Sequence, residues 1–150
     1  ARNINLCIDT AEALNIPTLI TEHCSKSLGP TDSSIHRSDD TSIIQKTTFS
    51  CCGNSNFLEN LSPRKNIILT GMEAHICVLE TAIELKHHNF YPYVLVDSVQ
   101  SSNKTKWKWG LEFMHKNGIK LLPTETLLFH LYNRADSEEF KIFAKKLKEQ

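Results

Sequence analysis

Residues 66–78 read NIILTGMEAHICV, a short β-branched and aliphatic run followed by a glycine, Gly71, and the start of an amphipathic helix. A buried strand that passes through a glycine into a helix is typical of open α/β sheets, in which ligands bind at the carboxyl edge of the strands. Cys77 falls in the first turn of the expected helix. Unpaired backbone N–H groups and the helix dipole favour the thiolate there, which is the nucleophilic form of cysteine. The stretch therefore predicts a strand-to-helix junction that presents a reactive thiol.

The face of the helix on which Cys77 lies separates two interpretations of this residue. At about 100° per residue, one broad arc of the helix is apolar. Cys77 lies off that arc and shares a face of the helix with four other residues: Glu80, Thr81, Glu84 and His88. A cysteine that only filled a core should lie on the apolar side, which favours a reactive thiol. The alternative is a half-buried packing residue, the commoner use of a free cysteine.

Length and composition are those of one globular domain. The chain has 150 residues, of which 40% are apolar and 23% charged, and its formal net charge is zero. No basic cluster dominates, which argues against a nucleic-acid partner or a membrane surface. No apolar stretch approaches the roughly 18 residues of a membrane span. No signal peptide is recognised, although the first residue is not methionine and a leader or a longer amino-terminal segment could have been removed.

The five cysteines do not suggest a zinc site or a dithiol redox motif, because their number is odd and no CxxC pair occurs. Reduced thiols favour an intracellular location, and we expect the cytoplasm, with mitochondria or another organelle as alternatives. Cys51 and Cys52 are adjacent and are interpreted as two separate thiols. The polar stretch 22–40 is interpreted as a solvated loop, because its histidines and aspartates lack metal-ligand spacing. These residues are His23, Asp32, His36, Asp39 and Asp40.

Elsewhere the hydrophobic pattern alternates between strand and helix. Strands that alternate with helices favour a parallel, doubly wound sheet. Lys46 interrupts a strand and is either a solvent-face residue or a lysine held beside a developing anion. Asp97 ends a strand and either caps the next turn or contacts a ligand. Strands are expected at about 18–21, 43–49, 66–71, 91–97 and 119–122, and helices at about 2–15, 57–60, 77–88, 103–117, 123–132 and 137–148.

With these elements placed, the chain resembles the isochorismatase-like cysteine hydrolase family, in particular its branch of isochorismatase domain-containing proteins. The resemblance rests first on GMEAHICV at residues 71–78. It runs through nearly the whole chain, because four further stretches agree in collinear order: IPTLITE (16–22), GPT (29–31), KTTFS (46–50) and GIKLLPTE (118–125).

The resemblance implies a three-layer α/β/α fold with a doubly wound, mostly parallel, Rossmann-like sheet of six strands. It implies a triad of Cys, Lys and Asp, in which Cys77 matches the nucleophile and Lys46 matches the lysine. It also implies a cis peptide between Met72 and Glu73, and an oxyanion hole formed by the backbone N–H groups of Glu73 and Cys77. No cofactor and no metal are expected, because the Asp/His metal pattern of the nicotinamidase branch is missing after the second strand.

The aspartate of the triad has no match in this chain. In the family it ends the first strand, which should precede residue 1, whereas Asp9 and Glu12 lie on the helix that would follow. We therefore interpret residues 1–150 as a single domain that lacks its first strand, because a sheet without a central strand leaves ladder groups unpaired. The alternative is a protein that has lost its general base.

Three functions remain for this sequence. The first is a hydrolase in which Cys77 acts on a small amide or a related substrate, with a homo-oligomer expected from the family; the family's founding reaction on a vinyl ether needs no nucleophilic cysteine. The second is a catalytically impaired module that keeps the fold for interaction or oligomerisation, and the missing aspartate motivates it. The third is a dinucleotide-binding domain, suggested by Gly71 and Asp97, but the GxGxxG pattern is absent.

Overall fold

The computed structural model describes residues 1–38 and 41–148 of the chain. Among them, no helix combines the length and the apolar character that crossing a bilayer requires. Two short turns, labelled η1 and η2, are 3₁₀ and π helical, respectively. In chain order the elements are α1 (Arg2–Ala13), β1 (Leu19–His23), α2 (Ser25–Leu28), β2 (Ser42–Lys46), η1 (Cys51–Gly53), α3 (Ser55–Leu61), β3 (Asn66–Met72), η2 (Ala74–Val78), α4 (Leu79–His87), β4 (Tyr91–Gln100), α5 (Lys104–Lys116), β5 (Lys120–Leu122), α6 (Thr124–Tyr132) and α7 (Glu138–Lys148).

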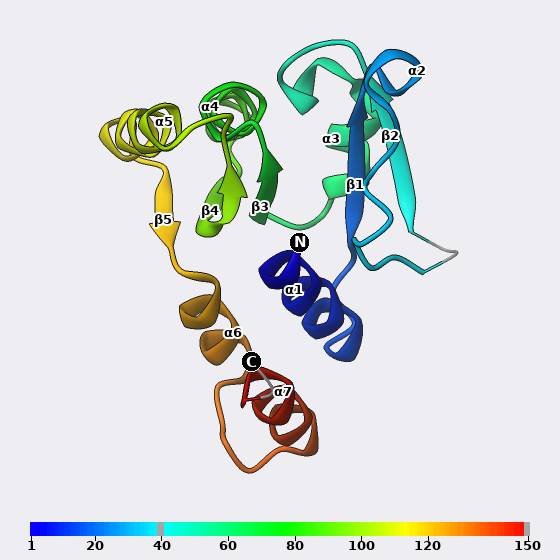
Figure 1. Ribbon diagram of the computed structural model, residues 1–150, viewed down its shortest axis with the longest axis vertical. Coiled ribbons are helices and arrows are strands. Elements are labelled where there is room, and N and C mark those ends of the chain that lie inside the picture. The colour runs from blue at the N-terminus through cyan, green and yellow to red at the C-terminus, as the bar shows by residue number, and fades with distance from the viewer. Residues whose placement is uncertain (39–40, 149–150) are drawn as a thin grey trace.

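The strands pair in parallel, which confirms the expected α/β class. β1 pairs with β2, from Leu19 opposite Ser42 to His23 opposite Lys46. β3, β4 and β5 form a second sheet in that order. Figure 1 shows the strands following one another as β5, β4, β3, β1 and β2 across the molecule, with helices on both sides. This is the layered arrangement expected of a doubly wound fold.

The single sheet expected from the sequence is divided into two, because no hydrogen-bonded ladder joins β1 to β3 within the described residues. In the doubly wound order, the strands lie side by side as 3-2-1-4-5-6, where each digit is a strand's number along the chain. β1 and β2 correspond to strands 2 and 3 of this order, and β3 to β5 correspond to strands 4 to 6. Strand 1 would then lie between β1 and β3. The division therefore lies at the point where this topology places a strand that the described residues do not supply.

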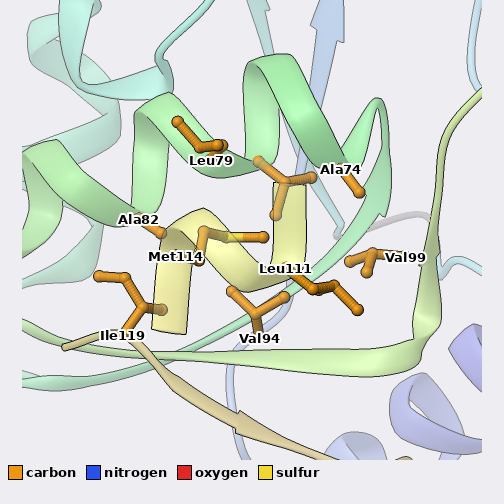
Figure 2. Close-up of a cluster of buried hydrophobic side chains, with 9 residues drawn as sticks. Ala74, Leu79, Ala82, Val94, Val99, Leu111, Met114 and Ile119 are labelled. Atoms are coloured by element: carbon orange, nitrogen blue, oxygen red, sulfur yellow. The ribbon is translucent and has the colours of Figure 1, made fainter. Parts of the chain in front are cut away.

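Helices cover the sheets on both faces. α4 and α5 lie on one side of β3, β4 and β5, whereas α1, α6 and α7 lie on the other side (Figure 1). Because η2 contributes to the core between β4, α4 and α5, the turn that carries Cys77 is anchored by packing on both sides of that residue. Figure 2 shows this core, whose buried members are Ala74, Val78, Leu79, Ala82, Val94, Val99, Leu111, Met114 and Ile119.

α7 is attached to the rest of the fold by aromatic packing and by an ion pair. The rings of Tyr132 and Phe143 stack with centroids 5.1 Å apart. Lys146 Nζ lies 2.6 Å from Asp9 Oδ2 on α1, and His36 Nδ1 lies 2.8 Å from Asp9 Oδ1. Burial raises the pKa of the Asp9 carboxyl, but the hydrogen bonds from Lys146 and His36 outweigh it, so that this pKa lies below its ordinary value.

Several of the boundaries expected from the sequence are wrong. The strand expected at 43–49 ends at Lys46, and a short helix, α2, lies in the stretch that was interpreted as a loop. β4 continues to Gln100, so Asp97 does not end it. The pairing register shifts just before Gly71, which pairs with Val99. Such a bulge adds residues to one strand without a clear signal in the sequence. Residues 74–78 form a π turn before α4 begins, and Cys77 therefore lies in that turn, not in the first α-helical turn.

Candidate active site

Cys77 lies in η2, between β3 and α4, at the carboxyl edge of the three-stranded sheet. Its side chain is half-buried. The turn closes on Glu73, whose carbonyl oxygen accepts hydrogen bonds from the N–H groups of Ile76 and Val78, both at 3.2 Å. The peptide bond between Met72 and Glu73 is cis. Cys77 is therefore presented on a short turn whose hydrogen bonds converge on the residue that follows β3.

The helix face that Cys77 was expected to share with polar residues is covered by protein only in part, because Glu80 and His88 are exposed. Thr81 on this face is 2% exposed, and its Oγ1 accepts a hydrogen bond from Cys51 N at 2.9 Å. Cys51 Sγ in turn lies 3.5 Å from Thr21 Oγ1 on β1. The sequence could not indicate this contact, because η1 comes from a distant segment. The chain that follows β2 is thus held alongside the first turn of α4.

Lys46 is the last residue of β2 and is 6% exposed, so the solvent-face interpretation of this lysine is wrong. Its Nζ donates hydrogen bonds to the carbonyl oxygens of Thr48 and Phe49, both at 2.9 Å, and lies 3.4 Å from His23 Nδ1. Within the described residues no ion pair joins Lys46 to a carboxylate. A buried ammonium group without an anionic partner is destabilising. The site therefore holds a cation whose charge the described residues leave uncompensated.

His23 belongs to β1 and not to the loop in which the sequence placed it. The parallel register puts it opposite Lys46. Its imidazole stacks on the ring of Phe49, with centroids 5.6 Å apart and planes inclined by 13°. Only strand pairing brings these residues together, and a single sequence does not reveal the register. His23 and Phe49 are therefore site residues that the sequence analysis did not identify.

The histidines and aspartates of the stretch 22–40 make separate contacts in the structure. His36 pairs with Asp9, and Asp32 accepts hydrogen bonds from the backbone and side chain of Ser34. Asp39 and Asp40 lie outside the described residues. Among the residues that the structure describes, no group of three or more His, Cys, Asp or Glu side chains could hold a metal ion.

Two of the motifs that carry the family resemblance meet at Glu22. Its Oε1 accepts hydrogen bonds from Thr31 N and Thr31 Oγ1, both at 2.8 Å. These two bonds, together with one from Gln45, lower the pKa of the Glu22 carboxyl below its ordinary value. The carboxylate thus ties the GPT turn to the carboxyl end of β1.

Asp97 has a structural role, but its carboxylate binds the start of α6 and not the turn after β4 that the capping interpretation named. Its Oδ1 accepts hydrogen bonds from Thr124 N at 2.8 Å and Thr124 Oγ1 at 2.7 Å, at the start of α6. Its Oδ2 accepts a hydrogen bond from Asn3 on α1 at 3.1 Å. Burial and the charge of Asp97 raise the pKa of the nearby Cys7 thiol to about 11. Asp97 thus joins β4, α6 and α1, away from the Cys77 turn.

Three polar side chains beside the Cys77 turn were also missed by the sequence analysis. They are the carboxylate of Glu73, the imidazole of His75 and the hydroxyl of Ser101, which contact one another. Ser101 lies 26 residues after His75, so no local spacing relates them. A shallow, open hollow of about 480 Å³ is found elsewhere; its lining comes from α7 and the residues before it and includes Phe140 and Lys145.

Comparison with protein families gives one match that spans most of the chain. The model described as "Isochorismatase domain" matches residues 1–126. A protein of *Phytophthora sojae* named secreted isochorismatase effector Isc1 is 30% identical over 152 residues, which cover 97% of this chain and 72% of that protein. Isochorismatase domain-containing protein 2 of *Rattus norvegicus* is 31% identical over 143 residues, which cover 95% of this chain and 68% of the relative.

Solved structures agree with this match. A structure described as MAR1 ribonuclease from *Caenorhabditis elegans* superimposes with a TM-score of 0.90 at 33% identity, covering 96% of this chain and 76% of that one. The YcaC gene product of *Escherichia coli*, described as an octameric hydrolase of unknown specificity, superimposes with a TM-score of 0.87 at 19% identity. That match covers 97% of this chain and 75% of the other, and at this identity it bears on the fold alone.

Proposed function

The chain belongs to the isochorismatase domain family, and on this premise we propose that it is a hydrolase in which Cys77 attacks the carbonyl carbon of a small amide. One observation carries the proposal. A half-buried cysteine in a turn at the carboxyl edge of one sheet accompanies a buried ammonium group, that of Lys46, at the carboxyl edge of the other. Positive charge and helix-start N–H groups are the surroundings in which a cysteine acts as a nucleophile.

In the proposed reaction the thiolate sulfur of Cys77 bonds to the carbonyl carbon, and the carbonyl oxygen becomes an oxyanion. The C–N bond then breaks, the nitrogen leaves as ammonia or an amine after taking a proton, and a thioester remains. Water attacks the thioester, which releases the carboxylic acid and restores the thiol. No cofactor and no metal enter this scheme.

The backbone N–H groups of Glu73 and Cys77 are the proposed oxyanion hole. Both belong to the turn that closes on the Glu73 carbonyl, which gives them a fixed frame relative to the sulfur. One donor of this kind contributes about 3 kcal/mol to transition-state stabilisation in a well-formed site. Lys46 is proposed to stabilise the thiolate through its charge.

We further propose that a strand outside these 150 residues completes the sheet between β1 and β3 and brings the third residue of the triad, an aspartate. β1 is paired with β2 only, and β3 with β4 only, so their facing edges lack partners within the described residues. The uncompensated charge of Lys46 is the second reason, because a carboxylate at the end of that strand would neutralise it.

The competing function is a catalytically impaired module that uses the fold for oligomerisation. The absence of a carboxylate beside Lys46 among the described residues favours it. A homo-oligomer, as expected from the family, is compatible with either function. The name of the *C. elegans* structure would suggest an RNA substrate, but a formal net charge of zero favours a small molecule.

Five free thiols support our cytoplasmic assignment, although one relative is named a secreted effector.

Competitive alkylation tests the proposed function. The folded chain is treated with a limiting amount of iodoacetamide at neutral pH, and modification of each cysteine is followed by peptide mass spectrometry. Cys77 should be alkylated faster than the other four cysteines, which serve as internal controls in the same tube. Equal rates at all five would count against a nucleophilic Cys77 and favour the oligomerisation module.

A further inference from the structure

Polar groups converge on the side of the Cys77 turn that contacts α5. His75 Nδ1 lies 2.9 Å from Ser101 Oγ and 3.4 Å from Glu73 Oε2. The same Glu73 oxygen accepts a hydrogen bond from Ser102 N at 2.8 Å. The side chains of His75 and Glu73 are 21% and 28% exposed, and Ser101 is buried. One carboxylate oxygen therefore joins the beginning of the turn to the chain that follows β4.

Glu73 is held in place through two of its groups, the backbone carbonyl and the side-chain carboxylate. Its carbonyl oxygen accepts from Ile76 N and Val78 N, and its carboxylate is fixed by Ser102 N and His75. The backbone nitrogen of Glu73 is bonded to the same Cα as both of these anchored groups. Fixing two substituents of that Cα fixes the direction of its bond to the nitrogen, which restricts where the N–H can point.

α5 supports the arrangement from outside. Gly110 lies against His75 so closely that a Cβ at position 110 would be 2.8 Å from His75 Cα. Ser102 precedes the first turn of α5, where the helix dipole favours a carboxylate such as that of Glu73. Lys106 Nζ lies 3.2 Å from Ser102 Oγ and adds a positive charge on the same side. The helix thus limits movement of the turn by steric contact and by charge.

We infer that the carboxylate of Glu73, His75 and Ser101 are positioning residues, which hold the Glu73 N–H where the oxyanion of the reaction forms. This inference rests on the proposed function and deepens it. The three side chains act through the backbone of the turn and do not contact the substrate. A displacement of the donor by about 1 Å is enough to slow a reaction substantially.

Two reagents that attack the same sulfur separate this role from a general effect on the thiol. Iodoacetamide alkylates the sulfur by displacement at a saturated carbon: the S–C bond forms as the C–I bond breaks, and iodide leaves without an oxyanion. p-Nitrophenyl acetate reacts through a tetrahedral oxyanion: the sulfur bonds to the acyl carbon, and p-nitrophenolate leaves and is measured by its absorbance. The ratio of acylation rate to alkylation rate at Cys77 therefore reports the oxyanion hole.

The ratio is measured for the wild-type chain and for Glu73→Gln and Ser101→Ala, with the sites of reaction mapped by mass spectrometry. Loss of a whole oxyanion-hole donor lowers rates by about 10²–10³-fold, so a loosened donor should lower acylation by about tenfold, with alkylation changed less than twofold. Glu112→Gln is the matched control, because Glu112 is a carboxylate on α5 that pairs with Lys116 at 2.8 Å and takes no part in these contacts. Its ratio should equal that of the wild type.

The outcomes distinguish the two proposals. If wild-type Cys77 reacts selectively and both variants keep the wild-type ratio, the inference is refuted while the proposed function stands. If acylation and alkylation fall together in both variants, the side chains act on the thiol or on folding, and the positioning role is also refuted. If wild-type Cys77 reacts with neither reagent, the proposed function fails, and this inference fails with it.

Discussion

Replacing Gly110 with alanine places a methyl group against the backbone of the turn that carries Cys77. An ideal Cβ at this position would lie 2.8 Å from His75 Cα, 2.9 Å from His75 Cβ and 3.1 Å from His75 N. These neighbours are mainly backbone atoms, which cannot move aside as the end of a flexible side chain can. Either α5 or the turn must shift.

The magnitude follows from two opposing effects. Carbon atoms in contact lie about 3.5–4.0 Å apart, so the helix and the turn must separate by roughly 0.7 Å or more. Overpacking of this kind costs about 1–3 kcal/mol. The higher helix propensity of alanine offsets about 1 kcal/mol of that loss. We expect Gly110→Ala to lower the free energy of unfolding by about 1 kcal/mol, which corresponds to a fall in melting temperature of about 2–4 °C.

Urea unfolding followed by tryptophan fluorescence measures this change, because Trp107 and Trp109 lie on α5. Lys108→Ala, at an exposed position of the same helix, is the control and should change the free energy of unfolding by less than about 0.5 kcal/mol. A Gly110→Ala variant as stable as the wild type, or more stable, would refute the close packing of α5 on the turn.

Three further predictions concern single groups. Burial raises the pKa of the Cys7 and Cys52 thiols to about 11, so at pH 8 both should be alkylated about 100-fold more slowly than a thiol with the ordinary pKa of 9.0. Their alkylation rates should rise about tenfold per pH unit up to about pH 11. A flat pH profile would contradict this prediction. Lys46→Met should slow alkylation of Cys77 by about tenfold at neutral pH, whereas Lys120→Met, on the far strand, should leave it unchanged; equal rates in the two variants would show that the Lys46 charge does not act on the thiol. Asp9→Asn should lower the free energy of unfolding by about 0.5–1 kcal/mol at pH 7. The difference should disappear as the pH falls below about 4, because a carboxyl with a lowered pKa stabilises the fold only while it is ionised. A difference that persisted in acid would exclude the ion pairs as its cause.

Local sequence patterns predicted the parts of the fold that local interactions determine. The apolar arc after Cys77 is buried through Val78, Leu79, Ala82 and Leu85. α5 begins where Asn103 was expected to cap it, with its side chain accepting from Lys106 N. Periodicity and capping depend on residues a few positions apart, so a single sequence contains them.

Features that depend on pairing between distant segments could not be predicted. The burial of Lys46 and its approach to His23 follow from the register of β1 and β2. Thr81 is buried because η1 folds over α4, and the position of Asp97 within β4 reflects a bulge. The contacts of Glu73 join residues almost 30 positions apart. For the same reason, the motifs identified candidate residues of the site but not the side chains that support them.

The central claim is that the sulfur of Cys77 attacks carbonyl carbon, and the most direct measurement is the location of the acyl group after brief exposure of the folded chain to p-nitrophenyl acetate. We predict a thioester on the peptide that contains Cys77, formed before any other cysteine is acylated and absent from Cys77→Ser. Acylation spread evenly over the five cysteines, or a Cys77 that stays unmodified while the others react, would contradict the account.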